Sequence, residues 1–378
     1  MGLFAPLLNR AWPLPVVSML VIGGLGMWRP GLWADELATW GAIEQPWPDL
    51  WALLRNTDAV NGGYYAMIKV WSAVFGTGEF ALRVPSLLAM SAAAGLTAAT
   101  GARLWAPRWG LLAGAVFVVL PTTSRYAAEA RGYAFALAFA ALASYLLVRL
   151  CRGESRRFWV YYALSLMAVG FFHLLALLLL SGHLLLLLLL KRELWWRWLI
   201  AAAVSCAALS PLAVLGARQR GQTSWIDPLS LSGLANAPKD LFESRWTALV
   251  VAVLIVLVVW RFRDRVTVAV AVLGLAPVVA LLLAATVIDI WVPRYLLFAV
   301  PVWALLAARA AAGTRHARAV ALTLVAILAV SGLGAQYDIR RSSGHTHDTL
   351  GAAAVIAERF REGDGFAVAL NEEVVPWE

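Results

Sequence analysis

The sequence predicts an all-α polytopic membrane protein, and three observations carry that prediction. Hydrophobic residues make up 62% of the 378-residue chain and charged residues only 14%, whereas soluble domains carry about 25% charged residues. The mean hydropathy is +0.75. Apolar runs recur along the chain, many of them close to the roughly 20 residues that a helix needs to cross a bilayer. Lipid is therefore the solvent for most of this chain.

Charged or turn-rich breaks divide the apolar runs into about 11 expected transmembrane helices. The runs fall near residues 13–29, 80–104, 109–124, 132–150, 158–173, 174–190, 195–215, 246–260, 266–288, 293–309 and 317–336. A break is required between Phe158 and Leu190, because one helix of that length would be far longer than a bilayer needs. His173 marks the expected turn. The first run, preceded by the basic residue Arg10, has the pattern of a signal peptide. No small-residue cleavage site follows it, so we expect an uncleaved first helix.

The distribution of charge predicts the orientation, because short cytoplasmic loops concentrate Lys and Arg. With the N-terminus inside, every second connection is basic and carries few acidic residues. These connections hold Arg10, Arg103, Arg108, Arg149, Arg152, Arg156, Arg157, Lys191, Arg192, Arg197, Arg261, Arg263, Arg265, Arg309, Arg315 and Arg318, with Glu154, Glu193 and Asp264. The net charge of +9 thus reflects membrane orientation and does not indicate nucleic acid. We expect a multi-pass protein of a bacterial cell membrane with a cytoplasmic N-terminus.

The long connections, 30–79 and 217–245, then lie outside with the tail. We expect a transmembrane module over 1–336 and a short external α/β segment over 337–378. Apolar residues at helical spacing predict short interfacial helices over 33–44 and 46–56, and the aromatic segment 62–76 is expected to dip into the membrane. In the tail, a helix over 349–361, a Gly363-Asp364-Gly365 turn and a strand-like FAVAL run are expected.

Asp35 and Glu36 are the first candidates for chemistry. Adjacent carboxylates near an apolar surface repel and desolvate each other, which can raise the pKa of one into the range of a general base. The alternative is a solvated helix start, where Asp is a common cap. Spacing alone does not decide between these two interpretations.

Two further clusters contain cations at expected external helix starts. The first comprises Arg125, Tyr126, Glu129, Arg131 and Tyr133, and the second Asp289, Trp291, Arg294 and Tyr295. Guanidinium groups offer paired donors and stay charged, which suits a phosphate. The alternatives are an Arg131–Glu129 pair that caps the turn and an arginine that snorkels to the interface.

The histidines carry weaker signals. His173 is the polar side chain of a strongly apolar turn and is a structural or a catalytic group. His183 lies deeper in a span, where ionisable residues tend to be functional, or it hydrogen-bonds a neighbouring helix. His345 and His347 with Asp348 form a poor metal motif in a polar tail.

Four motifs in order resemble the family 39-like membrane glycosyltransferases of the GT-C fold class, which include protein O-mannosyltransferases and the aminoarabinose transferase of lipid A. They are the Asp35-Glu36 pair, NGGYYAMIKVWSAVFGTGEFALRVPS, YAAEARGYA and RYLLFAVP. The similarity runs from Trp33 to about Pro301. It implies a GT-C-like bundle with its catalytic loop outside, which agrees with the orientation predicted from charge.

The resemblance implies transfer of a mannose- or arabinose-like sugar from a polyprenyl-phosphate donor to an external hydroxyl of a protein, lipid or glycan. Inversion at the anomeric carbon is implied, with no divalent metal or other cofactor. Asp35 matches the family's base and Glu36 would position it. Arg131 and Arg294 match its phosphate binders, and Lys69 and Arg125 are further candidates. The implied substrate pocket comprises Asn61, Tyr64, Tyr65, Glu129, Tyr133, His173 and Tyr295.

The chain departs from the family pattern at two places. Asn61-Gly62-Gly63 stands where relatives show His-Pro-Pro, and E-A-R-P-Y has become E-A-R-G-Y, so the geometry near the donor is expected to differ. The main alternative is a transporter or flippase for lipid-linked glycans, although such proteins place sites near the bilayer midplane in repeated halves. A different envelope glycan ligase or polymerase, or a noncatalytic scaffold, are the others. In every case membrane lipids surround the chain.

Overall fold

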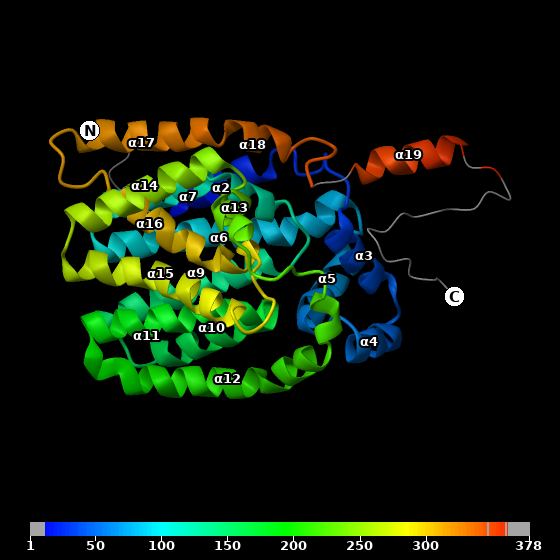
Figure 1. Cartoon of the computed structure of the whole chain (residues 1–378), viewed down its shortest axis with the longest axis horizontal. Coiled ribbons are helices and arrows are strands. Elements are labelled where there is room, and N and C mark those ends of the chain that lie inside the picture. Colours follow the sequence, from blue (N-terminus) through cyan, green and yellow to red (C-terminus); the bar gives the residue numbers. More distant parts are fainter. Residues whose placement is uncertain (1–11, 346–347, 360, 362–378) are drawn as a thin grey trace.

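A computed structural model of the chain describes residues 12–345, 348–359 and 361. Most helices run side by side along one axis, while α3, α4 and α5 gather at one end of the bundle (Figure 1). The N-terminal helices are α2 (Pro13–Gly24), α3 (Ala34–Glu44), α4 (Trp47–Asn56), η1 (Ala59–Asn61), α5 (Gly62–Phe75), α6 (Glu79–Leu104), α7 (Pro107–Val119), α8 (Pro121–Ala127) and α9 (Tyr133–Cys151). No strand occurs in these described ranges.

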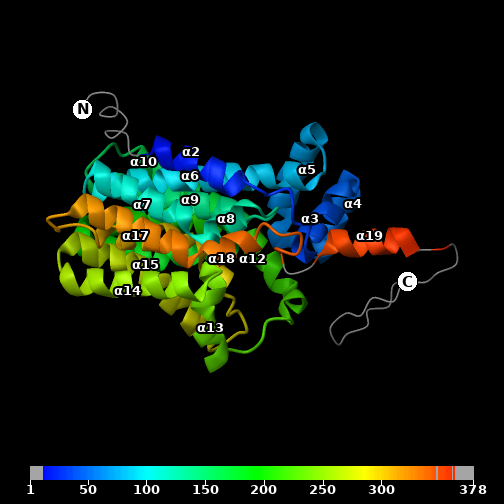
Figure 2. The same cartoon turned by 90° about the horizontal axis from the view of Figure 1, so that it is seen from above.

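The later helices complete the bundle and extend past it. They are α10 (Phe158–Phe172), η2 (Leu174–Leu178), α11 (Leu179–Leu190), η3 (Arg192–Leu194), α12 (Trp195–Arg218), η4 (Arg220–Thr223), α13 (Leu231–Phe242), α14 (Arg245–Arg261), α15 (Arg265–Ala285), η5 (Pro293–Ala299), α16 (Val300–Arg309), α17 (Ala317–Ser331), α18 (Leu333–Asp338) and α19 (Thr349–Arg359). Seen from above, α19 projects from the same end as α3–α5 (Figure 2). That end is called the α3–α5 end below.

Fewer of the described helices than expected are both long enough and apolar enough to cross a membrane by themselves. Four are long and apolar enough, or six if each of two bent pairs is one span, and four shorter apolar helices accompany them. The expected breaks are largely confirmed, including the turn at His173 between α10 and η2. The exact count of 11 spans stays a prediction.

Several expected spans are interrupted, and proline explains one of the interruptions. The run expected over 109–124 is α7 followed by α8, with a bend of 67° where Pro121 cannot continue the hydrogen-bond ladder of α7. The run expected over 293–309 begins as the 3-10 helix η5 at Pro293 and becomes α16 only at Val300. These interruptions bring the ends of α8 and η5 to the α3–α5 end.

α6 occupies the centre of the bundle, where it packs against α2, α7 and α9. Small residues allow the helices to approach closely, as is usual in membranes. A Cβ added to Gly110 of α7 would lie 2.2 Å from the carbonyl oxygen of Ala98 and 2.5 Å from the nitrogen of Ala102. The α6–α7 interface therefore requires glycine at position 110.

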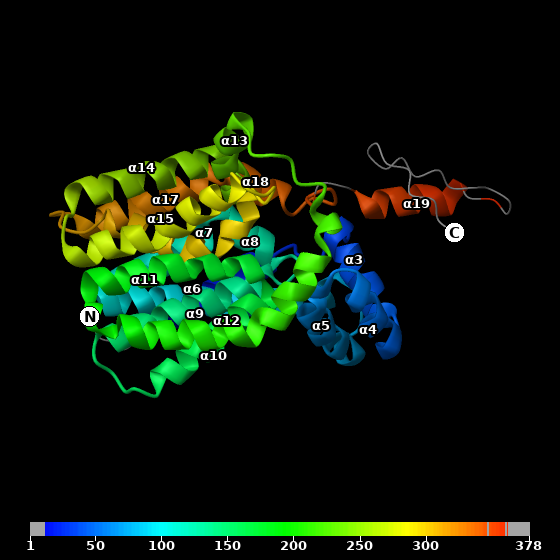
Figure 3. The ribbon, with the colours of Figure 1, turned by 60° about the horizontal axis from the view of Figure 1, so that its bottom comes forward.

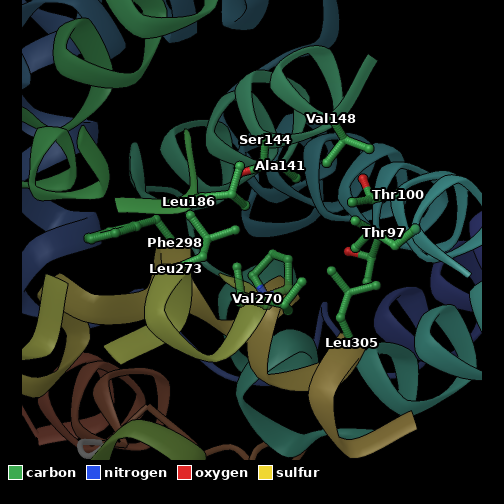
Figure 4. Close-up of a pocket in the computed structure, with 13 residues that line it drawn as sticks. Thr97, Thr100, Ala141, Ser144, Val148, Leu186, Val270, Leu273, Phe298 and Leu305 are labelled. Atoms are coloured by element: carbon green, nitrogen blue, oxygen red, sulfur yellow. The ribbon is translucent and has the colours of Figure 1, made fainter. Parts of the chain in front are cut away.

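His183 is a polar junction between three helices. Its Nε2 lies 3.0 Å from Ser144 Oγ of α9, and its Nδ1 lies 2.8 Å from Tyr162 OH of α10. Because both ring nitrogens have partners and the side chain is fully buried, the structure gives His183 a packing role. Ser144 also lines a narrow, largely apolar cavity among α6, α9, α11, α15 and α16, shown in Figure 4. That cavity contains none of the predicted site residues.

The short helices expected in the first long connection are present as α3 and α4, and the aromatic segment that follows is helix α5. The predicted tail helix is α19. The Gly363-Asp364-Gly365 turn and the FAVAL run lie outside the described residues, as do Arg10 and His347. The α9–α10, α11–α12, α14–α15 and α16–α17 connections lie at the opposite end of the bundle (Figures 1 and 3). Together with the helix ends that flank them, they carry most of the basic residues that are expected on the cytoplasmic side.

Candidate active site

Glu36 is the centre of a buried network at the start of α3. Arg83, from α6, is fully buried, and its Nε donates to Glu36 Oε1 at 2.8 Å while Nη2 donates to Oε2 at 2.5 Å. The same guanidinium donates to the carbonyls of Met27, Pro30 and Gly31. The backbone nitrogen of Ala130 donates to Oε1 at 2.7 Å. Arg83 thus fixes the chain that enters α3.

These contacts stabilise the ionised carboxylate of Glu36 and give it a structural role. Burial by itself raises the pKa of Glu36, but the hydrogen bonds from Arg83 and His345 outweigh it and hold the pKa at about 2. Both oxygens are occupied, so Glu36 is not placed to accept a substrate proton. The geometry agrees with a residue that positions its neighbour Asp35.

Asp35 is the accessible member of the pair, with 28% of its side chain exposed. Its Oδ2 lies 3.8 Å from Nε of Arg131, and its backbone oxygen lies 3.4 Å from Nη1 of the same residue. Thr39 bridges α3 to the 128–132 turn, because its hydroxyl lies 3.1 Å from the carbonyls of both Asp35 and Ala130. The carboxylate of Asp35 therefore stands at a fixed place between a cation and solvent.

Asp58 extends this arrangement on the other side of Arg131. It has a left-handed backbone with φ of 61°, it accepts from Asn61 Nδ2 at 2.6 Å, and it accepts a hydrogen bond from Tyr65 OH. Tyr65 OH in turn accepts from Arg131 Nη1 at 3.1 Å. Asp58, Tyr65, Arg131 and Asp35 form a continuous line of contacts across α3, α5 and the 128–132 turn. The sequence analysis did not select Asp58.

Arg125 and Glu129 pair with each other inside the α8–α9 turn. Arg125 Nη1 lies 2.6 Å from Glu129 Oε2, and the guanidinium stacks 5.4 Å from the ring of Trp33. Burial raises the pKa of Glu129 to about 7, against the opposing charge of Arg125. The alternative of an Arg131–Glu129 pair is therefore wrong, since Arg125 is the partner of Glu129 and Arg131 pairs with Asp35.

Arg294 approaches the same region from η5. Its Nε donates to Tyr133 OH at 3.1 Å, and its guanidinium lies 5.1 Å from the ring of Trp225. The ring of His173 lies 5.2 Å from that of Tyr133 and 5.0 Å from that of Tyr295.

Several buried polar atoms in this region have no hydrogen-bond partner among the described residues. They are Trp33 Nε1, Glu129 Oε1, Arg131 Nε, His173 Nδ1 and Trp291 Nε1. Buried polar atoms in native proteins are normally paired, so a concentration of unpaired ones needs an explanation. Ordered water or a polar ligand can pair with such atoms.

Two predicted site residues lie in different surroundings. The ammonium of Lys69 donates to the carbonyls of Ile43 and Gln45, both at 2.6 Å, where it caps the C-terminal end of α3. Tyr64 is buried against Phe135, with ring centroids 6.1 Å apart. The ammonium of Lys69 is thus engaged by backbone carbonyls and not by the Asp35–Arg131 pair. Within the described ranges, no group of three His, Cys, Asp or Glu side chains is placed to hold a metal ion.

Comparison with solved structures identifies proteins with a similar fold. No protein-family model and no curated protein matches the chain. The crystal structure of ArnT from Cupriavidus metallidurans in the apo state matches with a TM-score of 0.62 and 16% identity, over 91% of this chain and 67% of that chain. The same ArnT bound to undecaprenyl phosphate matches with a TM-score of 0.58 and 15% identity, over 91% and 68%.

These matches extend over nearly the whole chain and confirm the expected class of fold. They do not separate family 39 from its GT-C relatives, and at this identity they carry the fold alone. The chain is thus a polytopic membrane protein with the GT-C fold of ArnT.

Proposed function

We propose that this chain is a glycosyltransferase that moves a sugar from a polyprenyl-phosphate donor to an acceptor hydroxyl on the external face. One observation carries the proposal. Asp35, a partly exposed carboxylate, lies 3.8 Å from the buried cation Arg131 at the end of a GT-C bundle that also carries Arg294. The undecaprenyl phosphate bound by the ArnT structure supports the class of donor.

Asp35 acts as the general base in this proposal. Its carboxylate takes the proton of the acceptor hydroxyl while the hydroxyl oxygen attacks the anomeric carbon. The bond from that carbon to the donor phosphate breaks, and the polyprenyl phosphate leaves with the electron pair. A single in-line displacement inverts the anomeric centre. Glu36 keeps Asp35 in place and exchanges no proton.

The arginines stabilise the leaving phosphate. The two terminal nitrogens of Arg294 and the Nε of Arg131 have no hydrogen-bond acceptor among the described residues. Donors already placed where negative charge develops are the largest electrostatic contribution in many enzymes. Tyr133, Tyr295 and His173 surround Arg294 and supply polar groups for the sugar.

The isoprenoid chain has a path along the outside of the bundle. A hollow of about 360 Å³ lies between α9 and α10, lined by Phe139, Leu142, Leu146, Tyr161, Leu164 and Ser165. Phe139 is six residues beyond Tyr133 on α9, or about 9 Å along a helix. The stacked rings of Phe135, Phe172 and Phe139, with centroids 4.8 and 5.8 Å apart, connect the hollow to the site.

Mass spectrometry of lipids that copurify with the chain identifies the donor. We expect a polyprenyl phospho-sugar, with a mannose- or arabinose-like sugar as the first candidate, and no requirement for a divalent cation. Radiolabelled transfer from that lipid to candidate protein, lipid and glycan acceptors then identifies the acceptor. Movement of the intact lipid across liposome membranes without transfer would instead support a flippase.

Asp35→Asn tests the base directly. We expect transfer to fall below about one part in a thousand, with binding of undecaprenyl phosphate unchanged, because the carboxylate acts only in the transition state. Asp49→Asn is the matched control, since Asp49 is an exposed carboxylate of α4. Full activity of Asp35→Asn would remove Asp35 from the role.

A further inference from the structure

The chain beyond α18 folds back onto the start of the 30–79 connection. Residues 339–345, called the strap below, include Arg340, whose Nε donates to the carbonyl of Leu25 at 2.8 Å. Just beyond the strap, the hydroxyl of Thr349 donates to the carbonyl of Leu32 at 2.9 Å. Both ends of the strap are thereby tied to the segment between α2 and α3.

Glycines on the facing segment allow this close approach. A Cβ on Gly31 would lie 2.3 Å from the hydroxyl oxygen of Thr349, and one on Gly26, whose φ is +75°, would lie 3.2 Å from the side chain of Arg340. Gly26 also needs the left-handed backbone that glycine adopts without cost. Both sides of the contact are therefore adapted to it.

His345 connects the strap to the active-site region. Its side chain is fully buried, and its Nδ1 lies 3.4 Å from Glu36 Oε2. Burial lowers the pKa of His345 to about 4, against the pull of Glu36, and the other charges that face it are Arg125 and Arg83. The neutral imidazole then donates its Nδ1 proton to the carboxylate.

We propose that His345 is a positioning residue of the active site, which holds Asp35 in place through Glu36. This inference rests on the proposed function for the role of Asp35. Glu36 receives donors from three distant parts of the chain: Arg83 of α6, Ala130 of the 128–132 turn and His345 of the strap. The backbone nitrogen of Trp33, at the start of α3 itself, also donates to Oε2 at 3.4 Å.

Few orientations of the Glu36 carboxylate satisfy all these donors at once. With His345 present, Oε2 is held to the strap as well as to Arg83, so Asp35 and the backbone nitrogen of Ala130 keep their places relative to Arg131. Without His345, Oε2 keeps Arg83 and the backbone nitrogen of Trp33 but loses its link to the strap, and the first turn of α3 gains freedom. Small displacements at a reacting group reduce rates steeply.

Hydrogen–deuterium exchange of the full chain in nanodiscs tests the positioning without any substrate. We expect His345→Ala to exchange about fivefold or more faster in peptides covering 33–37 and 128–132, because a lost hydrogen bond lowers the cost of local opening. His345→Asn should exchange like the wild type, since its amide nitrogen can replace Nδ1. Ser343→Ala is the control, being an exposed residue of the strap.

Unchanged exchange in His345→Ala would overturn the proposal, and so would faster exchange in Ser343→Ala to the same degree. If His345→Ala does not fold, His345→Gln replaces it, because its amide is displaced by one methylene. In that case exchange equal to that of His345→Asn overturns the proposal.

A transfer assay with the copurified donor supplies the second measurement. We expect kcat to fall about tenfold to hundredfold in His345→Ala with the donor KM unchanged, and His345→Asn to recover most of it. If no variant, including the wild type, transfers sugar, the proposed function fails while the exchange result still decides the role of His345 at Glu36. A larger donor KM at normal kcat would contradict positioning of the base.

Discussion

Asp35 and Glu36 are neighbours in sequence, but their carboxylates have different surroundings. Glu36 turns into the protein toward Arg83, and Asp35 keeps partial exposure beside Arg131. The two carboxylates therefore have different roles. Glu36 fixes the first turn of α3, and Asp35 remains available for chemistry. From the adjacent carboxylates alone, either Asp35 or Glu36 could serve as the general base. The surroundings of the two side chains favour Asp35.

The Glu36–Arg83 pair predicts strong energetic coupling. Glu36→Gln or Arg83→Met alone should each destabilise the chain by roughly 3–5 kcal/mol, because a buried charge is left without its partner. The double variant should cost clearly less than the two single costs together. SDS-induced unfolding in mixed micelles measures the free energies, with Arg55→Met, an exposed arginine of α4, as the control. Additive losses would show that the pair is not coupled.

Acid should destabilise the chain in two steps that involve the same network. The pKa of His345 is about 4 in the folded chain against 6.5 normally, and that of Glu36 is about 2 against 4.5. Both are lowered, so the unfolded chain takes up the protons first, and stability falls as pH drops from 6.5 to 4 and again from 4.5 to 2. The second step is on the order of 3 kcal/mol.

Unfolding free energies measured at pH 7, 5 and 3.5 check this assignment. His345→Asn should lack the upper step and Glu36→Gln the lower one, each relative to the wild type. A difference between Glu36→Gln and the wild type that stays constant over this range would contradict the lowered pKa.

Residue patterns alone could not reveal this network. Arg83 is visible as a cation inside an apolar run, yet nothing local says that it pairs with a residue 47 positions earlier. Asp58 likewise precedes a glycine-rich turn and looks like ordinary turn chemistry. The motifs selected Asp35, Arg131 and Arg294 because those residues interrupt apolar sequence at helix starts, whereas long-range partners need the fold.

At the scale of helices, glycine positions distinguish packed from open surfaces. Gly110→Ala should destabilise the chain by at least about 2 kcal/mol, because the added Cβ would overlap Ala98 and Ala102 of α6. Gly41→Ala in α3 has open space around it and should be neutral or stabilising by about 0.5–1 kcal/mol. Thermal unfolding in detergent compares the two. Equal effects would show that α6–α7 contact does not depend on Gly110.

Hydrophobic runs and short-range periodicity predicted where helices occur. They did not always predict the residues at which the helices begin and end. α3, α4, α6, α9 and α19 begin or end within a few residues of expectation. The bend between α7 and α8 could have been predicted from Pro121, since the residue before proline disfavours the helical backbone. The 3-10 geometry of η5 and the break before α18 have no comparable local signal.

At the scale of the whole molecule, the basic connections and the candidate active site lie at opposite ends of the helix bundle. The basic connections gather at one end, and α3, α4 and α5 lie at the other (Figure 1). Asp35 belongs to α3 and contacts Arg131, and Arg294 contacts Tyr133 at the start of α9. The positive-inside rule relates this asymmetry to the membrane, and it predicts that the α3–α5 end faces away from the cytoplasm. A lipid phosphate and an external acceptor could then meet there.

Labelling with a membrane-impermeant maleimide on intact cells tests that orientation. Cys151 and Cys206 are first replaced by serine, and single cysteines are introduced as Asp49→Cys in α4 and Ser155→Cys in the α9–α10 connection, both at exposed positions. We expect the α4 cysteine to react on intact cells and the other only after permeabilisation. The reverse pattern would place Asp35 in the cytosol, where an external acceptor cannot reach it, and the proposed reaction would require a cytosolic acceptor instead.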